Sequence, residues 1–215
     1  PGETVAVVGP TGAGKSTVAK LVTRFYDPDA GAVLIDGHDL RDVTLASLRR
    51  QLGVVPQEPF LFNGTIGENV AFGRPDASTE EIETSCRLVG LGELIDRLDD
   101  GMDSLVHERG SSLSSGERQL LALARAFHAR PRVLVLDEAT SNLDLRSESV
   151  IERALDVVLE GRTAIVIAHR LATAMRADRI AVVDQGRVIE MGSHSELLAA
   201  GGAYARMFET WASHA

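Results

Sequence analysis

The sequence predicts an α/β fold built around a mostly parallel sheet. Short aliphatic runs alternate with segments of helical periodicity, and this alternation predicts strands joined by helical crossovers. Apolar residues make up 44% of the 215 residues but aromatic residues only 4%, so aliphatic side chains must build the core. Such a composition is typical of a parallel sheet that helices cover on both faces.

Six short apolar runs are the predicted strands of this sheet. They are residues 4–8, 32–35, 53–55, 133–136, 164–167 and 180–183. A glycine-rich loop and an apolar-periodic helix at about residues 15–24 follow the first run. The run 188–191 comes after Asp184, Gln185 and Gly186, and it reads as the returning strand of a hairpin.

The pattern becomes helical between about residues 75 and 130. Ser78 with Glu81 three residues later forms a capping box that opens a helix, and residues 91–98 and 117–128 are further helical segments. We therefore expect residues 1–74 and 131–215 to form the core and residues 75–130 to form an inserted α-helical subdomain.

Charge and composition limit the possible partners and the cellular location of the protein. The chain has 22 Lys and Arg against 31 Asp and Glu, and a net charge of −9 argues against nucleic acid as a partner. The single Cys86 excludes an internal disulfide and favours a cytosolic setting. No apolar run approaches the ~20 residues that cross a bilayer. The chain begins without Met or a signal peptide, only a few residues before a predicted strand, so we expect a longer polypeptide.

A phosphate-binding loop follows the first predicted strand. The stretch Gly-Pro-Thr-Gly-Ala-Gly-Lys-Ser matches the pattern G-x-x-x-x-G-K-[ST], in which backbone N–H groups and a helix N-terminus hold phosphate oxygens. Lys15 is expected to reach the β- and γ-phosphates, and the Ser16 hydroxyl to bind Mg²⁺. The predicted nucleotide-binding residues here are Gly9, Pro10, Thr11, Gly12, Ala13, Gly14, Lys15, Ser16 and Thr17. A plain glycine-rich turn is the alternative.

Two carboxylates follow the predicted strand 133–136. Asp137 and Glu138 come at its C-terminal end, where open α/β sheets bind their ligands. We expect Asp137 to hold Mg²⁺, directly or through water, and Glu138 to orient and deprotonate an attacking water. The alternative is a solvated acidic turn.

Residues 113–117, Leu-Ser-Ser-Gly-Glu, resemble the signature motif of the ABC ATPases. Gln57, His169 and the stretch 141–144 that ends in Asp144 occupy the places of that family's Q-loop, H-switch and D-loop. The chain is thus similar to an ABC ATPase domain. The resemblance implies a P-loop NTPase (RecA-like) core, ATP and Mg²⁺ as cofactors, and a dimer with a second such domain, identical or different.

The resemblance also assigns roles across that dimer. Ser114 and Gly116 lie at a predicted helix start, whose donors can bind an anion. In the family this anion is the γ-phosphate held by the other subunit, and Ser115 and Glu117 lie beside it. Glu117 stands where the commonest signature has Gln, and Ser115 where it has Gly. The acid favours the helix dipole, but it can repel nucleotide.

Three further residues have a family role and a plainer alternative. The resemblance implies that His169 contacts the γ-phosphate and holds Glu138 in line. It implies that Gln57 offers its amide oxygen to Mg²⁺ or to water, and that Asp144 bridges the dimer. Taken alone, His169 can be structural, Gln57 a loop residue and Asp144 a helix N-cap.

Residues 55–66 and 108–110 are similar to exporter domains that are fused to transmembrane helices. This implies substrate export, a transmembrane domain upstream in the same polypeptide, and a place at the cytoplasmic face of the plasma membrane. The stretch 60–62 can also be loop packing. The rival functions are a soluble ABC ATPase that acts on nucleic acid or ribosomes, and an ATP-dependent dimerisation module without hydrolysis.

The start of the chain departs from the family pattern. No aromatic residue precedes Gly9 to stack on adenine, and the antiparallel strands that normally precede Pro1 are missing, as if truncated. Base stacking is worth about 1–3 kcal/mol on comparable platforms. We therefore expect these 215 residues alone to bind ATP weakly.

Overall fold

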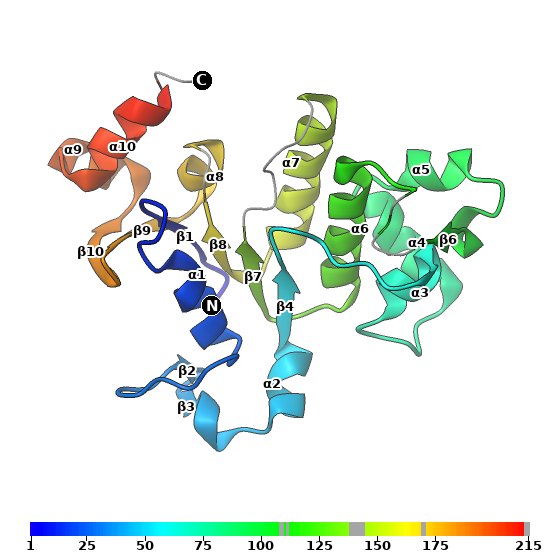
Figure 1. Ribbon diagram of the computed structural model, residues 1–215, viewed down its shortest axis with the longest axis horizontal. Coiled ribbons are helices and arrows are strands. Elements are labelled where there is room, and N and C mark those ends of the chain that lie inside the picture. The colour runs from blue at the N-terminus through cyan, green and yellow to red at the C-terminus, as the bar shows by residue number, and fades with distance from the viewer. Residues whose placement is uncertain (108–109, 111, 138–144, 169–170, 213–215) are drawn as a thin grey trace.

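A six-stranded sheet forms the centre of the protein. The computed structural model describes residues 1–107, 110, 112–137, 145–168 and 171–212. The strands lie in the order β10-β9-β1-β8-β7-β4, and only β10 runs antiparallel to its neighbour (Figure 1). Their bounds are β1 Thr4–Val8, β4 Leu52–Val55, β7 Val133–Asp137, β8 Thr163–Ile167, β9 Arg179–Asp184 and β10 Arg187–Gly192. The predicted mostly parallel sheet is confirmed.

The register of the parallel strands brings their carboxyl ends to one edge of the sheet. In the centre, Val7 of β1 is level with Ile167 of β8, and Ile167 is level with Asp137 of β7. On the outer side, Val55 of β4 is level with Leu136. The loops that follow β1, β7, β8 and β4 therefore start side by side, and this edge carries the predicted site.

One predicted strand lies outside the main sheet. The run 32–35 contributes only the two residues Leu34–Ile35 (β2), which pair with His38–Asp39 (β3) in a separate two-stranded sheet. Asp36 and Gly37 both have positive φ, 51° and 80°, which is the backbone of a two-residue hairpin turn. The chain therefore reverses before β2 can reach the main sheet. In contrast, the predicted hairpin return over 188–191 is confirmed as β10.

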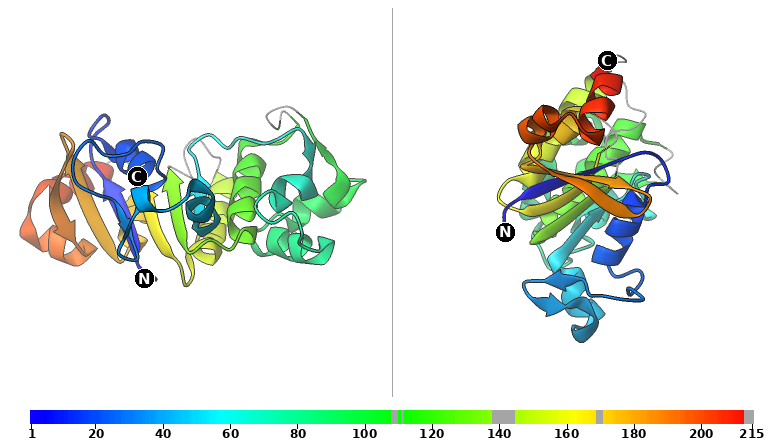
Figure 2. Two further views of the ribbon diagram at one scale, coloured as in Figure 1. Left: turned by 90° about the horizontal axis from the view of Figure 1, so that it is seen from below. Right: turned by 90° about the vertical axis from the view of Figure 1, so that its left-hand side faces the viewer.

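Helices cover the sheet and extend beyond it at both ends. Helices α1 and α7 lie against the sheet and the C-terminal helices lie beyond β10, whereas α3–α6 lie beyond β4 (Figures 1 and 2). The helix bounds are α1 Lys15–Val22, α2 Leu45–Gln51, α3 Ile66–Ala71, α4 Thr79–Leu88, α5 Gly92–Arg97, α6 Ser115–His128, α7 Leu145–Leu159, α8 Leu171–Arg176, α9 His194–Ala200 and α10 Ala203–Ala212. Two further strands, β5 Gly64–Thr65 and β6 Leu105–Val106, pair near α3.

The helices beyond β4 share a core with the sheet. Buried side chains of α3–α6 form one continuous cluster with Val55 of β4 and with Leu134 and Leu136 of β7. The predicted capping box of Ser78 and Glu81 opens α4, as the sequence indicated. Because the cluster runs across residues 75 and 130, the division into a core and an inserted subdomain stays a prediction.

Cys86 of α4 belongs to this core. The side chain is fully buried, and burial raises the pKa of its thiol to about 12. The thiol is therefore protonated and unreactive at neutral pH, as expected for an ordinary buried cysteine. None of the helices in the described ranges has the length and apolar character needed to cross a bilayer.

Candidate nucleotide-binding site

The phosphate loop begins where β1 ends. Gly9 has a φ of 151°, and a Cβ at this position would overlap the carbonyl oxygen of Val183 on β9. Gly12 and Gly14 adopt left-handed φ angles of 81° and 106°. A side chain would strain these positions, so the glycines are needed to turn the chain from β1 into α1. The loop is fixed to the neighbouring hairpin by a hydrogen bond of 2.8 Å from Gly186 N–H to the Ala13 oxygen.

The turn from this loop into α1 gathers positive charge. The Lys15 side chain is only 5% exposed, and its Nζ donates to the carbonyl oxygens of Gly9 at 2.7 Å and Pro10 at 3.1 Å. Helix α1 starts without a side-chain cap and without an acidic residue in its first turn. The uncapped N-terminus of α1 and the Lys15 ammonium thus belong to the same turn of the chain, a combination that suits an anion. Ser16 and Thr17 are exposed beside them.

The other predicted magnesium ligands come from the same edge of the sheet. Asp137 is the last residue of β7, and Gln57 follows β4 by two residues and is exposed. Since β7 neighbours both β8 and β4, the strand order places these two residues on neighbouring strand ends. Glu138, Asp144 and His169 lie outside the described residues, although Glu138 directly follows β7 in the chain.

The signature residues form the start of α6. Ser114 is the N-cap, and its hydroxyl accepts a hydrogen bond of 3.2 Å from Glu117 N–H. Ser114 and Ser115 are exposed, whereas Gly116 is buried against α7. A Cβ on Gly116 would lie 2.6 Å from Ser147 Oγ and 2.7 Å from Ser147 Cβ. Glycine is thus required here because the two helices approach closely.

The signature and the phosphate loop are separated within one copy. Helix α6 packs against α3, α4, α7 and β4, at one edge of the sheet. The phosphate loop joins β1 to α1, and two strands, β8 and β7, lie between β1 and β4 (Figure 1). The two predicted phosphate-binding helix starts therefore lie apart within a single chain.

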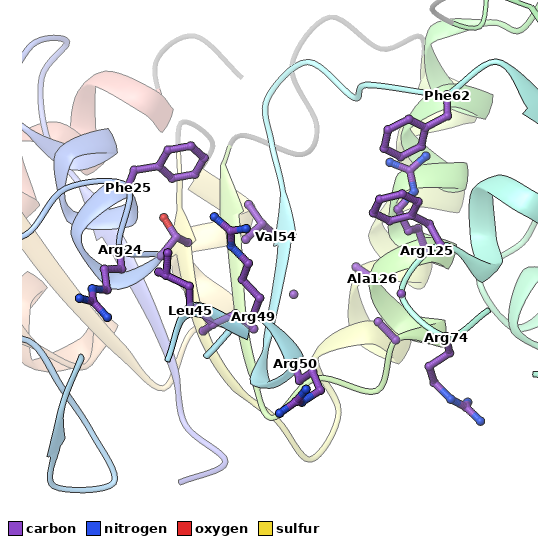
Figure 3. A pocket seen from close by; sticks show the side chains of 16 residues that line it. Arg24, Phe25, Leu45, Arg49, Arg50, Val54, Phe62, Arg74, Arg125 and Ala126 are labelled. Atoms are coloured by element: carbon purple, nitrogen blue, oxygen red, sulfur yellow. The ribbon is translucent and has the colours of Figure 1, made fainter. Parts of the chain in front are cut away.

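A groove of about 830 Å³ opens between α2, β4 and the C-terminal half of α6. Figure 3 shows Phe25, Leu45 and Arg49 on one wall and Phe62 and Arg125 on the other. Phe25 is 74% exposed and Phe72 is 62% exposed, which is unusual in a chain with few aromatic residues. Among the described residues that line it, none belongs to the phosphate loop or to the signature.

Arg125 anchors the α6 wall of this groove. Its guanidinium donates to the main-chain oxygens of Asn69 at 2.9 Å and Phe60 at 2.8 Å, and to Asn69 Oδ1 at 2.8 Å. It also lies 5.0 Å from the centre of the Phe62 ring, which stacks on Phe72. Burial lowers the pKa of Arg125 to about 10, so the side chain keeps its charge at neutral pH.

Sequence reasoning missed most of this groove. It found residues 55–66 similar to exporter domains that are fused to transmembrane helices, and the structure places Phe62 of this stretch on the groove wall. It did not identify Phe25, Arg49, Phe72 or Arg125. The signal available was the adjacent pair Phe25 and Tyr26 just after a predicted amphipathic helix, both of them exposed in the structure.

Comparisons with known proteins point to one family. A family profile described as "ABC transporter" matches residues 1–141. The chain is 53% identical over 207 residues to the cyclolysin secretion/processing ATP-binding protein of Bordetella pertussis, covering 96% of this chain and 29% of the relative. It is 50% identical over 207 residues to the ATP-dependent lipid A-core flippase of Salmonella typhimurium, covering 96% of this chain and 36% of the flippase.

A solved structure shows the same fold. A bacterial Atm1-family ABC exporter with ATP bound matches the whole chain with a TM-score of 0.91 and 50% identity, and the match covers 37% of that exporter chain. The chain thus spans about a third of the length of these relatives. From the phosphate loop, the signature helix and these matches together, it follows that the chain belongs to the ABC transporter family, of which it forms the ATP-binding and ATP-hydrolysing domain.

Proposed function

We propose that this domain hydrolyses MgATP as one half of a dimer and so drives the export of a substrate across a membrane. The observation that carries the proposal is the separation of the Lys15 loop and the Ser114 helix start by two strands. Each of them is half of a phosphate site, and only a second copy or a similar domain can bring both halves onto one nucleotide. ATP then holds two domains together, and its hydrolysis releases them.

The predicted site residues fit magnesium chemistry. Ser16, Gln57 and Asp137 offer hydroxyl, amide and carboxylate oxygens, which are the ligands that Mg²⁺ prefers. When bound, Mg²⁺ neutralises charge on the phosphates during phosphoryl transfer. Lys15 and the first N–H groups of α1 hold the phosphates, and Glu138 takes the proton of the attacking water. His169 keeps Glu138 and the water in line, and Asp144 crosses the dimer interface.

The groove between α2, β4 and α6 suits a partner that transmits movement to the nucleotide site. We infer that a short amphipathic helix of a transmembrane domain docks there, with apolar side chains on Phe25 and Phe72. Among the described residues, no carboxylate forms an ion pair with Arg125 or with Arg49 on the opposite wall. The docked helix should therefore carry at least one acidic residue. Because the groove connects β4, which precedes Gln57, with α6, which begins at the signature, movement there reaches both halves of the site.

With such a partner, we propose, the domain lies at the cytoplasmic face of the plasma membrane. We propose that the transmembrane domain precedes residue 1 in the same polypeptide, and that residues 75–130 act as a lobe that carries the signature. The exporter and secretion relatives support this arrangement. The net charge of −9 weighs against a soluble ABC ATPase that acts on nucleic acid.

The test uses the complete protein that carries this sequence, reconstituted in lipid nanodiscs. ATP hydrolysis should require Mg²⁺ and should be lost in Lys15→Ala. Hydrolysis that depends on added RNA or DNA, and not on the lipid environment, would favour the soluble alternative. ATP-driven dimerisation without any hydrolysis would favour the other alternative, a module that dimerises on ATP and does not hydrolyse it.

A further inference from the structure

The start of α6 carries a carboxylate inside the predicted phosphate site. Glu117 accepts a hydrogen bond of 2.8 Å from Ser114 N–H through Oε2, while Ser114 Oγ accepts from Glu117 N–H. This capping box occupies two of the four N–H groups that a helix leaves unpaired at its start. The N–H groups of Ser115 and Gly116 have no acceptor within the helix, so they are the donors that face an incoming phosphate.

Arg97 pairs with this carboxylate from another helix. Its guanidinium, at the end of α5, donates to Glu117 Oε1 at 2.5 Å. The Arg97 side chain is 66% exposed and that of Glu117 is 20% exposed. Burial raises the pKa of Glu117, but hydrogen bonds from Ser114 and Arg97 outweigh burial and leave the pKa below its usual value. At neutral pH, therefore, the pair is fully ionised.

The capping box does not need the arginine. Glu68 closes the same box on α3 with Thr65, by hydrogen bonds of 2.8 and 3.0 Å. Within the described ranges, no arginine or lysine forms an ion pair with Glu68. A solvent-exposed ion pair also adds little to stability. Neither helix capping nor folding thus accounts for Arg97.

The charge of the incoming ligand does account for it. A carboxylate beside the Ser115 and Gly116 donors repels a triphosphate, and the repulsion is strong at short range where water is excluded. We propose that Arg97 is a positioning residue of the nucleotide site, which neutralises and holds Glu117 so that the start of α6 accepts the γ-phosphate of ATP bound to the other copy. This inference rests on the proposed two-copy function.

The experiment is a double-mutant cycle on MgATP hydrolysis by the complete protein in nanodiscs at low ionic strength. Arg97→Ala should raise KM for MgATP by about three- to tenfold and change kcat less, as expected for one unscreened charge near the ligand. In a Glu117→Gln background, the same Arg97→Ala change should leave KM where Glu117→Gln alone sets it. The KM difference should also shrink as salt rises, because salt screens exposed charges.

A matched control comes from the other end of α6. Arg130 is 65% exposed and pairs at 3.1 Å with Glu81, the glutamate of the capping box on α4, away from the signature. Arg130→Ala therefore removes an equally exposed arginine from the same kind of box, and it should leave KM unchanged. Arg97→Lys keeps the positive charge and should restore most of the affinity for MgATP.

The possible results distinguish the proposed role of Arg97 from the proposed function of the domain. If Arg97→Ala raised KM equally in the natural chain and in the Glu117→Gln background, neutralisation of the carboxylate could not be the cause. Additivity of the cycle would therefore overturn the role of Arg97, as would an effect of Arg130→Ala of the same size. Both results leave the proposed function standing if the unsubstituted protein hydrolyses ATP. An unsubstituted protein without hydrolysis would overturn both.

Discussion

Replacing Arg125 by Met tests whether this arginine holds the groove together. The change keeps most of the volume but removes the guanidinium that donates to Asn69 and Phe60. Asn69 is 1% exposed, so its main-chain oxygen loses its donor in a buried place, at a cost of about 1–3 kcal/mol. Phe60 is exposed, and its oxygen can take water instead. Loss of the contact with the Phe62 ring adds about 0.5–1 kcal/mol.

Met recovers part of this loss, because burial of an apolar side chain replaces burial of a charge. We expect Arg125→Met to lower the free energy of unfolding by about 2 kcal/mol in urea titrations. Arg125→Lys should lose nearly as much, because an ammonium cannot reach the acceptors that the planar guanidinium bridges. Arg49→Met, on the opposite wall, is the control and should change stability by less than about 0.5 kcal/mol. Equal effects of Arg125→Met and Arg49→Met would refute the reasoning.

Three other predictions test the site. Glu138→Gln should lower kcat by about 10²–10⁴-fold while ATP still binds and traps the dimer, and near-normal turnover would remove Glu138 from its role. Gly116→Ala should push α6 from α7 and lower stability by about 1–3 kcal/mol in thermal or urea unfolding. Ser147→Gly should relieve much of that loss, whereas simple additivity would contradict the close approach. Because the pKa of Glu117 is lowered on folding, its contribution to stability is present above its unfolded value of 4.5 and is lost as pH falls further. The stability difference between the natural chain and Glu117→Gln should thus narrow in urea titrations below pH 4.5, and a constant difference would contradict it.

The sheet could be predicted because its strands are continuous aliphatic runs with sharp ends. The runs 133–136 and 180–183 each lie inside a strand of the structure, β7 and β9. Most residues of these two strands are buried, so nearly every position of each run is apolar. The run 32–35 has the same composition but misled the prediction. Its turn at Asp36 and Gly37 comes so early that Leu34 stays 59% exposed, and local turn chemistry outweighed the apolar pattern.

The site residues also fall into those that the sequence could predict and those that it could not. Gly9, Lys15 and Ser114 lie at strand and helix ends and make their contacts within a few residues along the chain, so a local pattern is enough to identify them. Arg97 and Arg125 act through contacts to residues 20 and 56 positions away, and no spacing in the sequence indicates such pairs. Long-range partners of this kind become visible only when the helices are packed.

The central claim is that the Lys15 loop of one copy meets the Ser114 helix start of another. The most direct measurement is disulfide cross-linking in the Glu138→Gln background, with Thr11→Cys in one copy and Ser112→Cys in the other, because both positions are exposed next to the two elements. The natural Cys86 is buried and should not interfere. We predict a cross-link between copies that forms with MgATP and not without it. A dimer that forms with MgATP but never yields this cross-link would contradict the claim.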